Sequence, residues 1–142
     1  LYGVLVHGRK PYVFVSLDHE EQGHNAILQC IREVIVDQYF SNGEKLPPVL
    51  FLHLDKRNKC RCVFAFLRLL VHLRVFQWIN VSFLPCGHTH EDIDHMFSRV
   101  AFALRKGRNM LTRDDMTRVL EEGLSFEGTP PYVKHWDRIA KL

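Results

Sequence analysis

Acidic and histidine side chains gather in one short stretch of this chain, directly after a predicted strand. Residues 87–94 read Gly-His-Thr-His-Glu-Asp-Ile-Asp and follow the apolar run 79–84. Another acid, Asp55, directly follows the apolar run 49–54. Sites in open α/β sheets lie beyond the carboxyl ends of strands, so acids that follow two parallel strands converge. Converging carboxylates offer the hard oxygen ligands that Mg²⁺ prefers, and a metal pair supports phosphodiester chemistry.

Within this stretch, a helix that starts near Thr89 would place His90 and Asp94 on one face, with Glu91 close by. An isolated Asp after a strand is usually a turn residue, and acids at a helix start complement its dipole. Neither explanation accounts for two histidines and three acids within residues 88–94, so we interpret the stretch as functional. The candidate metal ligands are Asp55, Asp94, His88, His90 and Glu91.

Hydrophobic periodicity predicts the elements that position these residues. The expected strands cover residues 1–6, 12–17, 49–54 and 79–84, and the expected helices cover 25–39, 63–75 and 89–106. The first two strands are typical of a β-hairpin, and the segment 63–75, which is apolar on nearly every side, is expected to be a buried helix. The order strand, strand, helix, strand, helix, strand, helix indicates a mixed α/β sheet. A last helix is expected to start at Thr112, with Asp115 as its capping-box partner.

Composition is typical of one globular domain, since 46% of the 142 residues are hydrophobic and 25% are charged. No apolar run is long enough to span a bilayer, so no membrane partner is expected. The first residues are not typical of a signal peptide, which favours a nuclear or cytosolic protein, not a secreted one, with reduced thiols. Because residues 1–3 read as part of a strand, we expect the chain to be a fragment.

Two segments carry a resemblance to a known family. Residues 52–55 read Leu-His-Leu-Asp and residues 58–59 read Asn-Lys. Together they resemble a degenerate form of a Leu-Asp-Asn…Glu-Asn-Lys-Asn motif. Residues 81–94 read Val-Ser-Phe-Leu-Pro-Cys-Gly-His-Thr-His-Glu-Asp-Ile-Asp, and Met-Phe-Ser-Arg follows at 96–99. Both segments resemble a transposon-derived domain family of unknown function, which looks like the catalytic domain of DDE-type transposases. The resemblance covers residues 1–106 and implies an RNase H-like fold whose first strand is missing.

The resemblance implies catalytic roles for particular residues. Asp55 would be the second acid of a triad, and Asp94 or Asp92 would be the third. The first acid has no counterpart, because its strand would lie upstream of Leu1. The resemblance also implies Mg²⁺ or Mn²⁺ as cofactor and DNA as partner, and it specifies no oligomeric state. Since the chain departs from the motif at Lys56, Arg57 and Cys60, we expect its catalysis to be impaired.

We therefore expect a partial RNase H-like domain over residues 1–107 and a helical C-terminal extension over residues 108–142. Basic side chains crowd beside Asp55 in the sequence, where a DNA phosphate would lie. The candidate nucleic-acid-binding residues are Lys56, Arg57, Lys59, Arg61 and Arg99.

Three other interpretations stay open. Residues 88–92 resemble the His-x-His-x-Asp-His signature of metallo-β-lactamase-like hydrolases, although Ile93 stands where that signature has its last histidine. A structural Zn²⁺ site is the second interpretation, because soft ligands occur at tight spacing. Its ligands would be Cys60, Cys62, Cys86 and His88. The third is a non-catalytic, transposase-derived module that binds DNA or protein.

Overall fold

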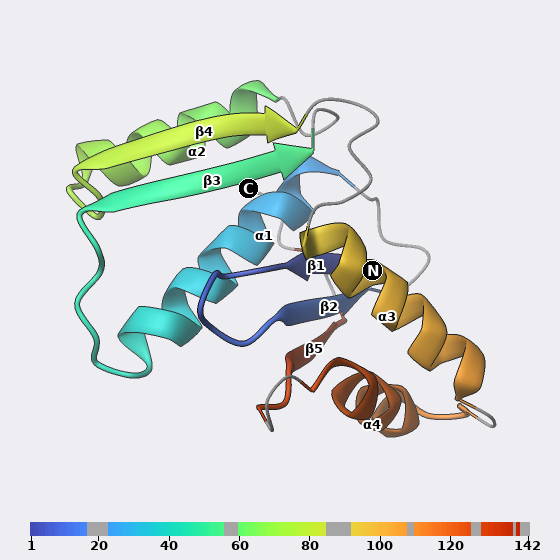
Figure 1. The fold of residues 1–142 in the computed structure, drawn as a ribbon. Coiled ribbons are helices and arrows are strands. Elements are labelled where there is room, and N and C mark those ends of the chain that lie inside the picture. Colours follow the sequence, from blue (N-terminus) through green and yellow to red (C-terminus); the bar gives the residue numbers. More distant parts are fainter. Residues whose placement is uncertain are drawn as a thin grey trace. The chain divides into compact units, whose positions relative to one another are not determined.

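The computed structural model describes residues 1–16, 23–55, 60–84, 92–107, 110–125, 129–137 and 139. Over these residues the chain is a mixed α/β protein with four α-helices and five strands in two small sheets (Figure 1). It divides into two compact units. The first unit comprises residues 1–20 and 89–139, and the second comprises residues 21–88 and 140–142. Within the described ranges, every helix is too short or too polar to cross a membrane.

The first unit is built on a three-stranded sheet. β1 (Tyr2–Val4) and β2 (Tyr12–Ser16) form an antiparallel hairpin, and Gly8 adopts a φ of +73° in its turn. This conformation favours glycine, which carries no Cβ to clash with the backbone. β5 (Tyr132–Trp136) pairs with β2 in parallel, so the strand order is β1-β2-β5. The predicted hairpin is therefore confirmed, with shorter strands than expected.

Strand β5 lies in the C-terminal segment, for which the sequence pattern predicts only helix. Residues 108–142 contain the expected helix α4 (Arg113–Leu124) and, in addition, β5. Two prolines precede β5, and Lys134 and His135 interrupt its apolar side chains, so the local pattern does not indicate a strand. Parallel pairing with β2 supplies the backbone hydrogen-bond partners that make this segment a strand.

Helices α3 (Asp92–Lys106) and α4 pack against β1, β2 and β5 and enclose the core of the first unit. The buried residues of this core are Val13, Met96, Val100, Leu120 and Leu124. Gly123 of α4 lies so close to α3 that a Cβ built on it would be 2.4 Å from the Cβ of Ala103. The missing side chain at Gly123 therefore permits the spacing of these two helices.

The capping box predicted at the start of α4 is confirmed. The Thr112 hydroxyl accepts a hydrogen bond from the Asp115 backbone N–H at 3.1 Å, and the Asp115 carboxylate accepts one from the Thr112 backbone N–H at 3.1 Å. The Thr112 hydroxyl also donates to the Asp115 carboxylate at 2.8 Å, and this bond, followed by those from the backbone N–H groups, holds the pKa of Asp115 below its usual range. The acid thus stays ionised where it satisfies backbone donors at the helix start.

The second unit combines a long helix with a strand–helix–strand motif. Helix α1 (His24–Ile35) continues into a π-helical turn, η1 (Val36–Phe40). β3 (Val49–Asp55) and β4 (Trp78–Leu84) are parallel strands joined by helix α2 (Arg61–His72), and Asp55 pairs opposite Leu84. The prediction of two parallel strands connected by a helix is confirmed.

Helix α2 ends earlier and is less buried than its sequence predicts. The chain leaves the helix after His72, because Arg74 adopts a left-handed φ of 57° and the Val75 N–H donates to the Leu70 carbonyl at 2.9 Å. Val63 and Leu67 are buried, whereas Leu69 is 49% exposed. The expectation of a buried helix therefore holds for one face of α2 and is wrong for the other. A helical segment without regularly spaced polar residues does not indicate which of its faces packs against the rest of the protein.

The described strands also do not form the single sheet that the sequence order predicts. The hairpin and the parallel pair belong to separate sheets, β1-β2-β5 and β3-β4. Pairing between distant strands depends on tertiary hydrogen bonds, which local periodicity does not encode. The coarse class, mixed α/β, is nevertheless confirmed.

Candidate functional site

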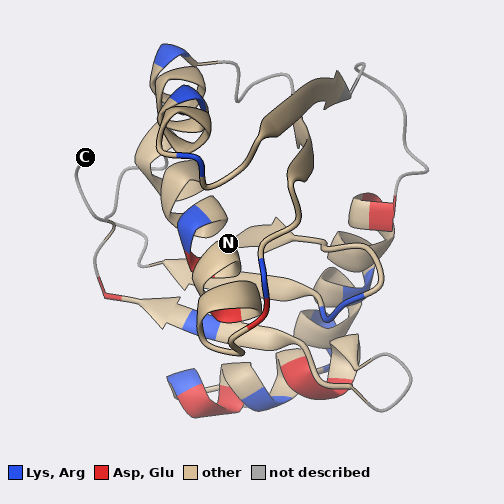
Figure 2. Ribbon diagram, turned by 90° about the vertical axis from the view of Figure 1, so that its left-hand side faces the viewer, with Lys and Arg blue, Asp and Glu red and all other residues tan. Residues whose placement is uncertain are grey.

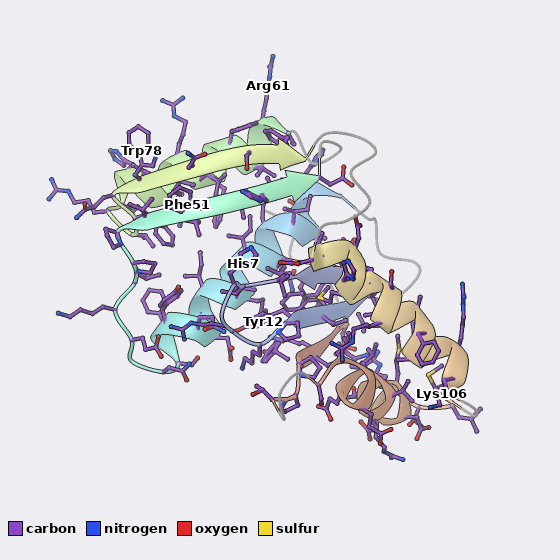
Figure 3. All side chains as sticks on the ribbon, viewed as in Figure 1. His7, Tyr12, Phe51, Arg61, Trp78 and Lys106 are labelled. Carbon is purple, nitrogen blue, oxygen red and sulfur yellow. The ribbon has the colours of Figure 1, made fainter. Side chains whose placement is uncertain are left out.

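Asp55 is the last residue of β3 and lies on the outer face of its sheet. Side chains alternate along β3, with Leu50, Leu52 and Leu54 more covered than their neighbours. Leu52 and Leu54 belong to the core that β3 and β4 share with α1 and α2. The exposed side of the same sheet carries Phe51 and Trp78, labelled in Figure 3. Asp55 therefore stands at the carboxyl end of a parallel pair, with its carboxylate in reach of solvent.

Asp92 and Asp94 lie in the first turn of α3, and both are exposed. At a helix N-terminus a carboxylate is stabilised by the unsatisfied backbone N–H groups. The Nδ1 atom of His7, in the hairpin turn, is 3.9 Å from the Oδ2 atom of Asp92. No local pattern in the sequence links His7 to this acid, because the turn and α3 are far apart along the chain.

The predicted catalytic acids are divided between the two units. Asp55 belongs to the second unit, whereas Asp92 and Asp94 belong to the first. His88, His90 and Glu91 lie outside the described residues, as do the basic candidates Lys56, Arg57 and Lys59. In the part of the chain that the structure describes, no three His, Cys, Asp or Glu side chains group closely enough to hold a metal ion.

The two described basic candidates have different surroundings. Arg61 is the first residue of α2 and extends away from the ribbon into solvent (Figure 3). The Arg99 guanidinium instead donates hydrogen bonds of 3.1 Å to the backbone carbonyls of Gly123 and Ser125. These carbonyls lie at the C-terminal end of α4, where backbone C=O groups have no N–H partner within the helix. Arg99 thus has a structural role that the sequence does not reveal.

Positive charge is concentrated in the second unit. This unit contains nine Lys and Arg against five Asp and Glu, whereas the first unit contains ten against eleven. Residues 60–84, which include α2 and β4, contain three arginines and no acid. In Figure 2, α4 carries both signs of charge, in contrast to α2. The excess of cations therefore lies on the unit that carries Asp55.

One family model matches this sequence, and it covers residues 1–141. Its description is "Domain of unknown function (DUF7869)". The chain belongs to the DUF7869 family. No curated protein and no solved structure matches it.

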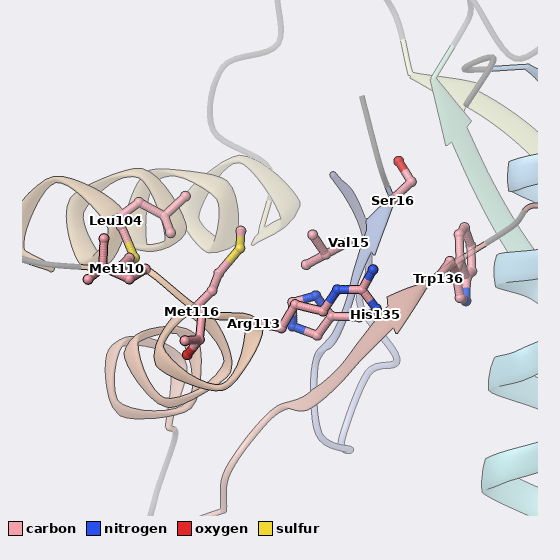
Figure 4. A pocket seen from close by; sticks show the side chains of 10 residues that line it. Val15, Ser16, Leu104, Met110, Arg113, Met116, His135 and Trp136 are labelled. Carbon is pink, nitrogen blue, oxygen red and sulfur yellow. The ribbon is translucent and has the colours of Figure 1, made fainter. Parts of the chain in front are cut away.

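A cavity of about 480 Å³ opens in the first unit of this DUF7869 chain (Figure 4). Its lining is mainly apolar, and the polar members are Ser16, Thr112, Arg113 of α4 and His135 of β5. The residues that line it are Val15, Ser16, Leu104, Met110, Leu111, Thr112, Arg113, Met116, His135 and Trp136. His135 Nε2 lies 2.9 Å from the Thr117 hydroxyl, and Arg113 forms an ion pair with Asp137. No local pattern in the sequence marks this cluster, because its members meet only when β5 pairs with β2.

His135 is expected to make the stability of the first unit depend on pH. Burial, and then the charge of Arg113, lower the pKa of His135 from its usual 6.5, although Asp114 and Asp137 oppose the shift. Below pH 6.5 the imidazole of His135 takes up a proton more readily in the unfolded chain than in the folded one. The free energy of unfolding therefore decreases as the pH is lowered below 6.5, and His135 does not change it above that pH. Urea unfolding between pH 7.5 and 5 measures this slope.

The matched control for this prediction is His95, an exposed histidine on α3. We expect His135→Gln to reduce the loss of stability in acid and His95→Gln to leave it unchanged. Equal slopes in the wild type and His135→Gln would contradict the assignment to His135.

The structure describes two of the four ligands that the zinc interpretation requires, Cys60 and Cys62. Cys60 is half-buried at the start of α2, and Cys62 is exposed. Cys86 and His88 lie outside the described residues. Cys30 is buried in α1, and burial raises the pKa of its thiol to about 12, so it stays protonated and unreactive.

Proposed function

We propose that this DUF7869 chain is part of a metal-dependent nuclease domain of the RNase H-like, DDE-transposase type, acting on DNA phosphodiester bonds. The supporting observation is the parallel pair β3–β4, in which Asp55 ends β3 directly opposite Leu84, the last residue of β4. In such sheets the active site lies beyond the carboxyl ends of the strands. The chain that leaves Leu84 leads, in sequence, through Gly-His-Thr-His-Glu to the acids that begin α3.

The chemistry of the donor set suits Mg²⁺ or Mn²⁺, since carboxylate oxygens are the ligands that these hard cations prefer. Asp55 and Asp94, with Asp92 as the alternative to Asp94, would supply them. The described residues alone do not complete a metal site. Two carboxylates hold a divalent ion weakly, and phosphoryl transfer depends on precise positioning and charge neutralisation. We therefore expect slow cleavage.

The proposal is tested by nicking of supercoiled plasmid DNA with Mg²⁺ or Mn²⁺. We expect metal-dependent nicking that Asp55→Ala and Asp94→Ala each reduce by about 100-fold or more, because even groups that merely orient metal ligands are worth 10–100-fold. Asp114→Ala is the matched control, since Asp114 is also an exposed acid in the first turn of a helix, α4. Its nicking rate should equal that of the wild type.

No nicking by the wild type under either metal would contradict the proposed catalysis. Equal loss of nicking in Asp114→Ala would also contradict it, because the loss would then reflect general damage to the unit. Circular dichroism of each variant separates loss of activity from loss of folding.

The second candidate function is binding of DNA without cleavage, and the charge distribution favours it. The second unit carries the excess of Lys and Arg, and α2 presents Arg61 and Arg68 without a neighbouring acid between residues 60 and 84. Both side chains belong to exposed residues. Cations on one solvated helix can neutralise successive phosphates and release their counterions.

We expect the affinity for duplex DNA to fall with salt, and the double variant Arg61→Ala/Arg68→Ala to lower the steepness of that dependence. Each phosphate contact contributes about 0.9 to the slope of log K against log salt, so the slope should fall by about 2. Fluorescence anisotropy over a range of NaCl concentrations measures it. Arg105→Ala/Lys106→Ala, which removes two exposed cations from α3, is the control and should leave the slope unchanged. Similar slopes in all three proteins would contradict binding through α2.

A further inference from the structure

Two cysteines lie on either side of a single residue where α2 begins. Cys60 is the N-cap residue, with an extended backbone at φ −134° and ψ 143°, and Cys62 lies in the first turn. The Cys60 sulfur accepts a hydrogen bond from the Cys62 backbone N–H at 3.4 Å. Cys62 is exposed and Cys60 is half-buried, so small oxidants reach the pair from solvent.

We propose that Cys60 and Cys62 are a site of reversible oxidation. The two residues form a disulfide with each other when the protein reacts with a small disulfide such as glutathione disulfide. The fold holds the two residues next to each other before any reaction, so pairing requires rearrangement of the first turn of α2 alone. This inference concerns the thiols themselves and does not depend on the proposed nuclease function.

The reaction balances as a thiol–disulfide exchange. The Cys60 thiolate attacks one sulfur of glutathione disulfide, breaks its S–S bond and releases one glutathione thiolate. The Cys62 thiol then loses its proton and attacks the Cys60 sulfur, which displaces the second glutathione. Two protein thiols are oxidised, one glutathione disulfide is reduced, and the two protons end on the two glutathione molecules.

The geometry also gives the order of attack. The Cys60 sulfur accepts the Cys62 N–H and lies at the N-terminal end of α2, a position typical of attacking thiols. Cys60 is therefore the attacking residue and Cys62 the resolving one.

Arg61 makes the product easy to identify. Trypsin cleaves after Lys59, Arg61 and Arg68, so Cys60 and Cys62 fall on separate peptides, 60–61 and 62–68. After incubation of the full chain with glutathione disulfide, alkylation of free thiols and digestion, we expect these two peptides joined by a disulfide. Reduction should release both, and Cys30 should be recovered alkylated after denaturation, since it is buried in α1.

Single serine variants test the order. Cys62→Ser is expected to stop at a glutathione adduct on Cys60, whereas Cys60→Ser is expected to lose the linked peptides and to react more slowly. A disulfide from Cys60 or Cys62 to Cys86 or Cys30 as the main product would overturn the proposal. Unmodified Cys60 and Cys62 under conditions that oxidise a free dithiol would overturn it too.

Discussion

Replacing Gly123 with leucine is expected to lower the free energy of unfolding of the first unit by about 3 kcal/mol, the upper part of the usual range for overpacking. A Cβ at this position would lie 2.4 Å from the Cβ of Ala103, far inside van der Waals contact. The Ala103 Cβ is fixed to its backbone and cannot rotate away, so α3 and α4 must separate. Separation also breaks the hydrogen bonds from Arg99 to the carbonyls of Gly123 and Ser125.

Gly123→Ala provides a graded test of the same contact. Alanine is the better helix former by about 1 kcal/mol, so a gain would be expected if the position were open. We expect a loss instead, and we expect Ala103→Gly to restore stability in the Gly123→Ala background because it returns the missing space. Amide hydrogen exchange of α3 and α4 measures these changes within the first unit. Stabilisation by Gly123→Ala alone would contradict the close approach.

Phe76→Ala is expected to cost the second unit about 3–5 kcal/mol, as is usual for a large aromatic side chain in a core. Phe76 is 1% exposed and packs in a cluster with Ile31 and Ile35 of α1. It follows directly on the left-handed turn at Arg74, which directs the chain from α2 back to β4. The loss should appear as a lower urea midpoint with unchanged secondary structure under native conditions.

The control for Phe76 is a second aromatic residue of the same segment. Trp78 is 65% exposed, so Trp78→Ala removes a large side chain with little burial and should change stability by about 0.5 kcal/mol or less. A comparable loss in both variants would contradict the burial that distinguishes them.

Local chemistry in the sequence was sufficient for several elements. Two apolar runs around a glycine-containing turn predicted the hairpin of β1 and β2, and further apolar runs predicted β3 and β4 with a helix between them. Thr112 and Asp115 predicted the start of α4, because a capping box requires residues three positions apart and nothing more distant. The sequence also predicted correctly that Asp55 ends a strand.

Other features depended on contacts between distant residues. The sequence could not assign β5 to the sheet of β2, the separation of the strands into two sheets, or the meeting of His135 with Thr117 and Arg113. Arg99 illustrates the same point in the candidate site. The sequence offered it as a candidate nucleic-acid-binding residue, whereas the fold directs its guanidinium to the end of α4.

The sequence by itself determined the type and order of most elements, the excess of cations near Asp55 in the chain and the acidic residues where α3 begins. These properties follow from side-chain periodicity, turn residues and charge, which act over a few positions of the chain. Tertiary structure alone decided which strands pair, which face of α2 is buried and that Gly123 must lack a side chain. The physical reason is that backbone hydrogen bonds between strands and close packing between helices are made by residues far apart in sequence, whose partners no local pattern specifies.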